Sequence, residues 1–477
     1  MDPKKKKTLI SINARTFIQV TALLAGLLIL SIVLTYLIPG GTFALLPNGE
    51  PDYLHYVPLP DSGGIPVWKG LLAPVLVFFS SDGLTLLMLA LFLFVISAAF
   101  QVMNDAGGIR AIVGAVSDRF RDRQHLLLVL TSFLFYCFGA FLGLFEEVLT
   151  LLPIVTALTL FIGLDSFTGF LICIISCGFG FAGAITNPFT VLLASEIIGV
   201  SPMLHISYRI LIFFVMFALL TGFVLLYVRR IRKDPAASLT FTHDEELRAA
   251  GNADAAPEGF SGGRKRVVRV YAVFLAVALI LIVGCSLSAS LRGYTVVVLI
   301  AYFLVFGILA GILAGGRPAA VLKSFGSGFL GALPTIVFIA FAASVKYVLE
   351  EGAVLPTIVN QINLLIAGHS PVLVALIIYL IVLLLEFFIS SSTAKAILVM
   401  GLLAMLQTGL TKEMLVLLYT FGDGYTNVIF PTSPVLLISL SMIHLDYFKW
   451  IRKSFPLFLV NTLLVVLFIV LGVLLGY

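Results

Sequence analysis

Long apolar stretches alternate with short polar segments along almost the whole chain. The stretches are rich in Leu, Ile, Val and Phe, and those of simple helical length lie at 16–38, 81–103, 206–228, 268–290, 294–314, 328–349 and 455–476. A helix of about 20 residues crosses a hydrocarbon core about 30 Å thick, whereas membrane barrels show alternating segments of about ten residues. The pattern therefore predicts an all-α polytopic membrane protein.

Composition supports this interpretation. The 477 residues are 60% hydrophobic and only 11% charged, and their mean hydropathy is +1.14. A soluble domain carries about 25% charged residues. The formal net charge of +5 comes from Lys and Arg at the ends of the apolar stretches and does not indicate nucleic-acid binding. The four cysteines lie in apolar runs without a metal-ligand pattern, so no cofactor is expected beyond a coupling ion, Na⁺ or H⁺.

Basic clusters orient the chain in the membrane. Lys and Arg are enriched in cytoplasmic loops, and the main clusters are "RRIRK" at 229–233, "RKRVVR" at 264–269 and "KWIRK" at 449–453. All clusters lie on one side only if two segments are re-entrant hairpins. We expect one hairpin at about 125–164, entering from the cytoplasm, and another at about 371–410, entering from outside. The protein is then expected in the cell inner membrane, with its N-terminus on the cytoplasmic side and its C-terminus on the outer side.

The chain also resembles itself at an offset of 245–246 residues. For example, "ITNPFTVLL" at 185 overlays "PTSPVLLIS" at 431. We therefore predict a first repeat at 1–230, a mobile cytoplasmic linker at 231–267, and a second repeat with an extra span at 268–477. The predicted orientations of the repeats are opposite, and such inverted repeats are characteristic of secondary transporters. Gene duplication without a transport role is the alternative.

Two long apolar segments, 167–200 and 413–445, contain helix breakers and are predicted to be broken helices. They include "CGFGFAGAITNPFTV" and "FGDGYTNVIFPTSPV". Interrupted backbone is tolerated at membrane depth only where it is buried in protein or lines a cavity. Helix packing through small polar residues is the alternative explanation. It accounts poorly for breakers and polar groups that coincide in both halves.

Each predicted hairpin tip faces a broken helix, and the tips "GLFEE" and "FISSSTAK" carry ionisable or hydroxyl groups. A charged side chain at the middle of a membrane costs about 2.5–3.5 kcal/mol on the insertion scale, so such groups are expected to be paired, protonated or functional. The candidate substrate ligands are Glu146, Glu147, Thr186, Asn187, Ser391, Ser392, Thr393, Lys395, Asp423, Asn427, Thr432 and Ser433. The candidate ligands of a coupling cation, with Na⁺ as the one metal considered, are Glu146, Glu147, Asn187, Ser392, Thr393, Asp423 and Thr432.

Two roles stay open for the lysine of the second tip. Lys395 can reach a substrate carboxylate or neutralise an acid. Lys346 and Glu386 lie deeper in spans and are expected to form a structural ion pair.

The chain resembles the anaerobic four-carbon dicarboxylate carrier family of the ion transporter superfamily, and specifically its YfcC-like branch. The resemblance covers nearly the whole chain and rests on "SAAFQVMNDAGGI", "GLFEEVLTLLPIV", "GAITNPFTVLLASEIIGVSP", "ISSSTAKAILVMGLLA" and "GDGYTNVIFPTSPVLL". It implies a scaffold domain, a transport domain with two opposed hairpins, a homodimer and an elevator-like mechanism. The tip and broken-helix residues then become cation and substrate ligands. The acidic first tip departs from the superfamily's Ser-Asn-Thr tips, and members of this branch are often described as candidate basic amino acid antiporters.

These observations predict a secondary active transporter, a symporter or antiporter, for a small carboxylate-bearing solute. An amino acid, with basic amino acids included, fits the acidic tip best. The alternatives are a Na⁺- or proton-coupled dicarboxylate carrier, and a channel or cation/proton antiporter without organic substrate. A membrane enzyme is disfavoured because Glu146 and Glu147 project about 100° apart on one turn, and no nucleophile–base set accompanies them.

Overall fold

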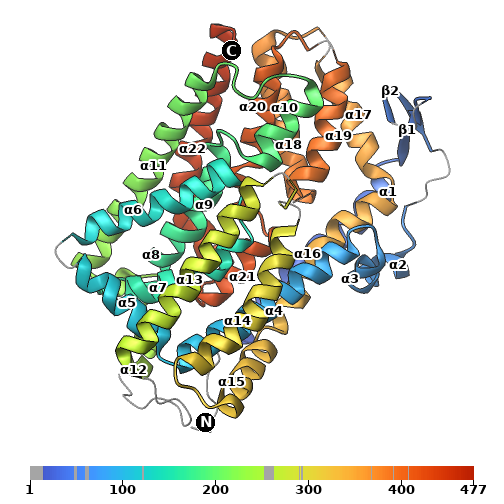
Figure 1. The fold of residues 1–477 in the computed structure, drawn as a ribbon. Coiled ribbons are helices and arrows are strands. Elements are labelled where there is room, and N and C mark those ends of the chain that lie inside the picture. The colour runs from blue at the N-terminus through green and yellow to red at the C-terminus, as the bar shows by residue number, and fades with distance from the viewer. Residues whose placement is uncertain are drawn as a thin grey trace.

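The computed structural model describes residues 14–47, 51–59, 64–120, 123–251, 263–288, 290–291, 294–366, 368–389, 391–406 and 408–477. These residues are mostly helical, with two short strands between the first helices (Figure 1). The α-helices and strands are α1 (Ala14–Leu37), β1 (Gly41–Leu45), β2 (Pro51–Pro58), α2 (Val67–Leu71), α3 (Ala73–Leu76), α4 (Gly83–Asp105), α5 (Gly108–Arg119), α6 (Gln124–Cys137), α7 (Leu152–Phe161), α8 (Ser166–Phe170), α9 (Ser176–Ala182), α10 (Leu193–Ile198), α11 (Ile206–Lys233), α12 (Phe241–Gly251), α13 (Arg264–Leu287), α14 (Thr295–Leu313), α15 (Pro318–Gly331), α16 (Pro334–Glu351), α17 (Val354–Ile366), α18 (Pro371–Phe388), α19 (Ser392–Met405), α20 (Lys412–Asp423), α21 (Pro434–Met442) and α22 (Tyr447–Leu475).

Short 3₁₀ and π segments connect or continue these helices. The 3₁₀ segments are η1 (Val77–Phe79), η3 (Glu147–Thr150), η6 (Pro235–Ala237) and η8 (Tyr425–Val428). The π segments are η2 (Phe138–Leu142), η4 (Leu171–Ile175) and η5 (Pro188–Leu192). Two of the π segments, η2 and η5, adjoin the predicted first tip and the first helix break, which fits the tendency of π segments to occur at functional sites.

Within the described residues, nine helical stretches are long and apolar enough to cross a membrane. They are Phe17–Leu37, Gly83–Asp105, Gln124–Leu142, Ile206–Lys233, Arg264–Cys285, Thr295–Leu313, Pro318–Glu351, Pro371–Phe388 and Tyr447–Leu475. The predicted all-α, multi-pass membrane protein is therefore confirmed.

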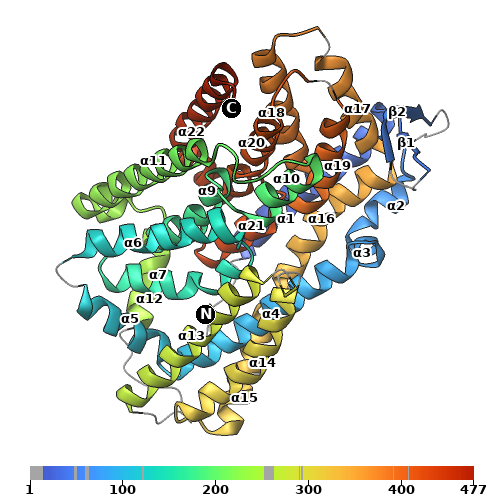
Figure 2. The ribbon, with the colours of Figure 1, turned by 45° about the horizontal axis from the view of Figure 1, so that its top comes forward.

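The helices form two groups. One group, which we call the lower group, contains α1, α3, α4, α14, α15 and α16, which pack on one another and run from the bottom of Figure 1 to its right side. The upper group contains α6 to α11 and α18 to α22, and Figure 2 shows the same separation from a second direction. The two groups meet where α16 and α1 of the lower group pack against α21 of the upper group.

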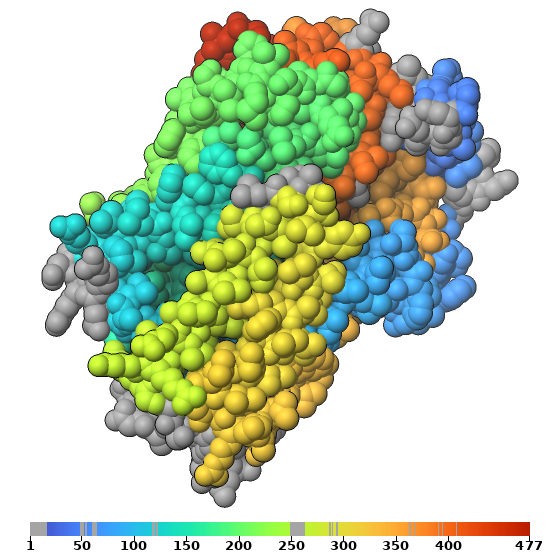
Figure 3. Space-filling view, in the orientation of Figure 1, coloured from blue at the N-terminus to red at the C-terminus, as the bar shows by residue number. Residues whose placement is uncertain are grey.

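The two halves of the sequence are interleaved within the upper group. Helix α10 from the first half packs against α19 from the second half. The space-filling view shows this as green atoms lying directly against orange atoms near the top of the molecule (Figure 3). The candidate site residues of both halves are therefore carried by one packed unit.

Left-handed helix ends recur at the spacing of the predicted repeat. A residue with positive φ commonly ends an α-helix, and the conformation strains residues other than Gly. Three pairs lie 245 or 246 residues apart: Gly107 and Ala353, Gly163 and Gly409, and Gly199 and His444. Each pair follows helices that the repeat overlays, namely α4 and α16, α7 and α19, and α10 and α21. Backbone conformation therefore supports the internal repeat, while the opposite membrane orientation of its halves stays a prediction.

Both predicted helix breaks are present, and both helices restart on a proline. The first broken helix runs through α8, η4 and α9 and restarts in η5 and α10 at Pro188. The second runs through α20 and η8 and restarts in α21 at Pro434. Proline fits the first helical position because it has no N–H group to leave unpaired there. The N-caps that precede the two prolines are Asn187 and Ser433.

The polar loop after α1 contains a β-hairpin that the sequence pattern did not predict. Strands β1 and β2 pair in antiparallel fashion, with a register irregularity after Phe43. The hairpin is tied to the second half, because Gly41 N donates to Ala353 O at 2.9 Å and the Tyr56 and Thr357 hydroxyls lie 2.8 Å apart. The loop is therefore a structural bridge between the halves.

The span expected at 328–349 lies mostly in α16 and begins in the last turn of α15, so the candidate span Pro318–Glu351 contains a break. Helix α15 ends at Gly331, and Pro334 begins α16. Helix α15 runs along α4, where Ser97 Oγ donates to Gly328 O at 2.8 Å and Ser324 Oγ donates to Asp105 Oδ2 at 2.6 Å. The two helices continue in the same direction along α4, because Ser324 pairs with Asp105 at the end of α4 and Lys346 pairs with Asp82 just before its start. The break between them follows Gly331 and precedes Pro334, which are the helix breakers in this stretch.

The linker expected at 231–267 is ordered over its described N-terminal part. Segments η6 and α12 dock beneath the start of α8, where Asp244 accepts hydrogen bonds from Ser166 N at 3.0 Å, Ser166 Oγ at 2.5 Å and Thr240 Oγ1 at 2.6 Å. The linker is therefore helical and packed up to residue 251, and its expected mobility stays a prediction. Residues 252–262 lie outside the described part of the chain.

Candidate functional site

Asn187 joins the first helix break to the first hairpin tip. Its Oδ1 atom accepts hydrogen bonds from Phe189 N at 2.9 Å and Thr190 N at 3.2 Å, and thereby caps the restarted helix. Its Nδ2 atom donates to Gly139 O in η2 at 2.8 Å. Asn187 is fully buried, so one side chain fixes the break against the tip.

The unwound backbone beside Asn187 pairs with the same π segment. Ile185 N and Thr186 N both donate to Ala140 O, at 3.1 and 3.3 Å. Thr186 Oγ1 adds a longer bond to Phe141 O at 3.4 Å. Backbone groups that the break leaves without helical partners are therefore satisfied by the tip, as burial requires.

Gly143 makes the sharp turn at this tip possible. Its φ angle is +67°, a conformation that L-residues other than Gly adopt only with strain. A Cβ atom here would lie 2.6 Å from Phe189 Cδ2 and 2.8 Å from Asn187 Oδ1. The tip and the break thus approach more closely at Gly143 than any side chain allows.

The two adjacent acids of the first tip have different environments. Glu146 is exposed, whereas Glu147 is only 8% exposed and begins η3. The Oε2 atom of Glu147 has no hydrogen-bond partner among the described residues. Cys177 of α9 also contacts this tip, because its thiol donates to Leu144 O. The sequence grouped the two acids, but only Glu147 is a buried carboxylate.

A buried charge cluster lies at the second tip, and we name it the Glu386–Lys395–Asp423 cluster. Lys395 Nζ contacts a carboxylate oxygen of Glu386 and lies 2.7 Å from Asp423 Oδ1. None of the three side chains is more than 2% exposed. Ser392 Oγ donates to Asp423 Oδ2 at 2.9 Å, which ties the start of α19 to the end of α20.

The cluster corrects one expectation and bears on another. Lys346 does not pair with Glu386; its Nζ lies 2.5 Å from Asp82 Oδ2 and 3.3 Å from Glu350 Oε1. Of the two roles left open for Lys395, neutralising acids is the one that the contacts show. Glu386 is therefore a member of the candidate site that sequence reasoning missed, although an acid at the end of an 18-residue apolar helix was a usable signal.

The other candidate residues divide by exposure. Ser391 and Thr393 are exposed, and Thr186 and Ser392 are partly exposed, so these four can reach a solute in this conformation. Asn427, Thr432 and Ser433 are buried. Asn427 Nδ2 donates to Asp423 O at 2.9 Å, while Thr432 Oγ1 has no hydrogen-bond partner in the described part of the chain.

The two breaks pack against each other. Gly424, between α20 and η8, approaches the end of α9 so closely that a Cβ atom would lie 2.6 Å from the Ala182 backbone. A Cβ atom on Gly178 would likewise lie too close to the side chain of Val428 in η8. The two tips and two breaks therefore belong to one continuous region of the upper group.

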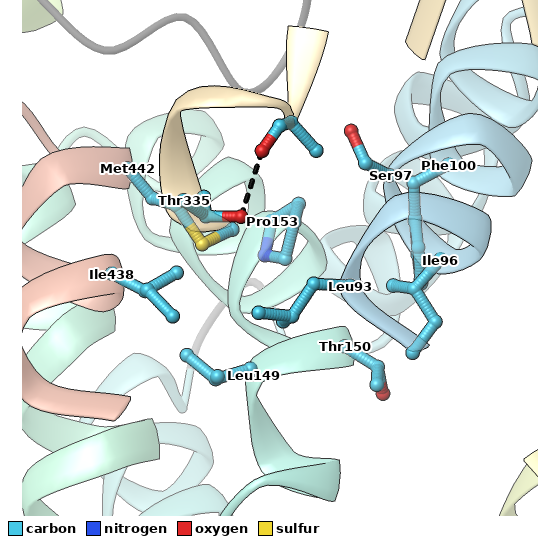
Figure 4. A pocket seen from close by; sticks show the side chains of 11 residues that line it. Leu93, Ile96, Ser97, Phe100, Leu149, Thr150, Pro153, Thr335, Ile438 and Met442 are labelled. Atoms are coloured by element: carbon cyan, nitrogen blue, oxygen red, sulfur yellow. Dashed lines mark hydrogen bonds between the residues drawn. The ribbon is translucent and has the colours of Figure 1, made fainter. Parts of the chain in front are cut away.

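An apolar cavity lies between the two helix groups (Figure 4). It contains about 440 Å³ of empty space, part of which is open to the exterior. Helix α4 and the start of α16 line one side, and η3, α7 and α21 line the other. Its polar lining groups are hydroxyls, and it has no charged residue; the lining is Leu93, Ile96, Ser97, Phe100, Leu149, Thr150, Pro153, Ala332, Thr335, Ile438 and Met442.

Related proteins extend over most of the chain. The chain is 28% identical over 433 residues to the candidate basic amino acid antiporter YfcC of Escherichia coli (strain K12), covering 86% of this chain and 82% of that protein. It is 24% identical over 371 residues to an uncharacterized protein of Haemophilus influenzae (strain Rd), covering 77% and 71%.

Two solved transporter structures align with lower similarity. The YdaH transporter of Alcanivorax borkumensis aligns over 96% of this chain and 100% of its own, with 18% identity and a TM-score of 0.44. MtrF of Neisseria gonorrhoeae, which is described within a class of antimetabolite efflux pumps, aligns over 96% and 95%, with 14% identity and a TM-score of 0.35. Both scores lie below 0.5, so the family assignment does not depend on these structures.

The family model for the C4-dicarboxylate anaerobic carriers matches residues 19–474, which is nearly the whole chain. Together with the membrane-spanning helices, this match shows what class of protein the chain is. The chain is a membrane transporter and belongs to the C4-dicarboxylate anaerobic carrier family.

Proposed function

We propose that the protein is a secondary active transporter of a small amino-acid-like solute, with basic amino acids as the preferred class. Glu147 carries this proposal. It is a buried carboxylate beside a helix break, and no ion pair to it is found among the described residues. A substrate ammonium or guanidinium group would supply the missing positive charge, because an uncompensated charge at membrane depth is costly.

The charge balance of the site supports a cationic substrate. The sequence suggested three acids, Glu146, Glu147 and Asp423, against Lys395. The structure pairs Lys395 with Glu386 as well as with Asp423, so the two tips and breaks together carry four of these carboxylates and one lysine. A dicarboxylate would add further negative charge in a region where water screens repulsion poorly.

A substrate carboxylate has a separate place to bind. Helix α19 begins at Ser392, and its N-terminus carries partial positive charge and N–H groups without helical partners. Ser391 and Thr393 flank this end and are exposed. An amino acid can therefore place its carboxylate at α19 and its cationic group toward Glu146 and Glu147.

Coupling, movement and assembly belong to the same proposal. A coupling ion, H⁺ or Na⁺, is assigned to the first tip and break, where Glu147 supplies the charge. The Thr432 hydroxyl, which has no hydrogen-bond partner among the described residues, supplies a further oxygen at the second break. We infer movement of the upper group past the lower group in an elevator-like manner within a homodimer of the inner membrane. Support comes from the family resemblance and from the cavity between the groups.

Binding of radiolabelled arginine to purified protein tests this assignment. Glu147→Gln keeps the size of the side chain but removes its charge, so arginine should bind at least about 30-fold more weakly, as expected for the loss of a buried ion pair. Glu196→Gln on α10 is the matched control, because Glu196 is exposed. The arginine affinity of this variant should equal that of wild type. Equal arginine affinity in wild type and Glu147→Gln would remove Glu147 from the site.

A coupled dicarboxylate carrier is the second candidate function. The family description names C4-dicarboxylates, and the hydroxyl-rich start of α19 suits a carboxylate of any solute. This function would be favoured over amino acid transport if succinate binds the wild-type protein tightly in the presence of Na⁺. Cationic amino acids should then not compete with succinate.

A further inference from the structure

The environment of the Lys395 ammonium group is that of a cation site. Besides the carboxylates of Glu386 and Asp423, the Nζ atom reaches Ile389 O at 3.3 Å. Ile389 follows the last residue of α18, and Asp423 is the last residue of α20. The ammonium is thus surrounded by oxygens from the C-terminal ends of two helices.

Helix C-terminal ends carry partial negative charge and attract cations. In transporters with broken helices, such ends and freed carbonyls are typical positions for a coupling ion. The second tip has these features, yet its centre holds the chain's own ammonium, with Lys395 completely buried. A second cation between the same oxygens would contact that ammonium and be repelled by it.

We propose that Lys395 is a tethered cation that permanently occupies the ion site of the second hairpin. The proposal rests on the transporter function proposed above and makes it more specific: the second hairpin is closed without Na⁺ from solution. Any coupling ion is then taken up at the first hairpin, where the buried Glu147 has no such internal partner among the described residues. The two halves of the repeat differ in this respect.

The geometry also explains why an internal cation suits this ion site. Lys395 lies on α19, Glu386 on α18 and Asp423 on α20, so the ammonium links both arms of the hairpin to the broken helix. Ser392 Oγ, which donates to Asp423, and the Tyr419 hydroxyl, which donates to Ser392 O, reinforce the same junction. A diffusible ion would make this junction depend on the salt concentration.

The test is to remove the ammonium and ask whether Na⁺ replaces it. Lys395→Met leaves two buried carboxylates around an empty position. Its Tm in choline chloride should fall below that of wild type, and 100 mM Na⁺ in place of choline should raise it by about 5 °C. The Glu147→Gln protein, in which Lys395 is intact, should show no Na⁺-dependent change in Tm. The Tm measurement needs no transported solute. The proposal for Lys395 can therefore fail while the proposed transport function holds, and the transport function can fail while the proposal for Lys395 holds.

A second variant covers the case in which Lys395→Met does not fold. Lys395→Met with Glu386→Gln removes one positive and one negative charge and keeps Asp423 and Ile389 O available to a cation. This double variant should also gain Na⁺-dependent stability, and adding Asp423→Asn should abolish the gain. The proposal is overturned if neither lysine variant responds to Na⁺ more than to choline. It is equally overturned if the Glu147→Gln protein with Lys395 intact is stabilised by Na⁺.

Discussion

Substitution of Asn187 should loosen two contacts that can be observed separately. Asn187→Ala removes the acceptor of the Phe189 and Thr190 amides, which have no acceptor within the restarted helix. Loss of an N-cap typically costs about 1–2 kcal/mol, so these two amides should exchange with solvent about 5–30 times faster. Hydrogen–deuterium exchange of the peptide covering 186–192 measures the effect.

Asn187→Asp is the matched variant at pH 8. The carboxylate still accepts from both amides, but it cannot donate to Gly139 O and places a negative oxygen beside that carbonyl. The contact between break and tip should weaken by about 1–3 kcal/mol, the cost of a buried carbonyl left unpaired. Exchange should then accelerate at Ile185 and Thr186, whose amides bond to Ala140 O, and stay slow at Phe189 and Thr190.

The two variants must therefore give different exchange patterns. Unchanged exchange at Phe189 and Thr190 in Asn187→Ala would refute the capping role. The same exchange pattern in both variants would show that the helix cap and the Asn187–Gly139 hydrogen bond cannot be separated. Exchange of α12, which is distant in sequence and docks at the start of α8, serves as the internal reference.

Two further predictions concern the hairpins. In membranes of known orientation, Phe161→Cys should react with an impermeant maleimide only from the cytoplasm and Lys412→Cys only from outside; labelling of both from one side would refute the inverted repeat. Gly143→Ala should lower Tm more than Gly163→Ala, because both have positive φ angles, each costing about 1–2 kcal/mol, but only the first meets neighbouring atoms within 4 Å. Equal losses of Tm would show that the close approach at the first tip is unimportant.

The sequence predicted the parts of this fold that follow from local chemistry. Long apolar runs gave the membrane helices, and prolines after polar residues located both breaks at Asn187–Pro188 and Ser433–Pro434. At the predicted repeat offset of 246 residues, Gly163 and Gly409 share a left-handed conformation, although the sequence did not predict the helix ends themselves. These features depend on residues within one turn of each other or on a copied pattern.

Other features depend on contacts between distant segments and could not be predicted locally. The β-hairpin after α1 is held by Ala353 and Thr357, about 300 residues away. Glu386 was assigned to Lys346 because both lie in apolar helices, but the bend between α18 and α19 brings it to Lys395 instead. Adjacent acids also diverge, since the short 3₁₀ turn exposes Glu146 and buries Glu147.

Flux in proteoliposomes tests the central claim most directly. Vesicles loaded with unlabelled lysine or ornithine should accumulate radiolabelled arginine when they contain wild-type protein, and accumulation should be lost with Glu147→Gln but kept with Glu196→Gln. Succinate and fumarate should neither enter nor compete. Na⁺-dependent uptake of succinate or fumarate, with no response to arginine, ornithine or lysine, would contradict the account.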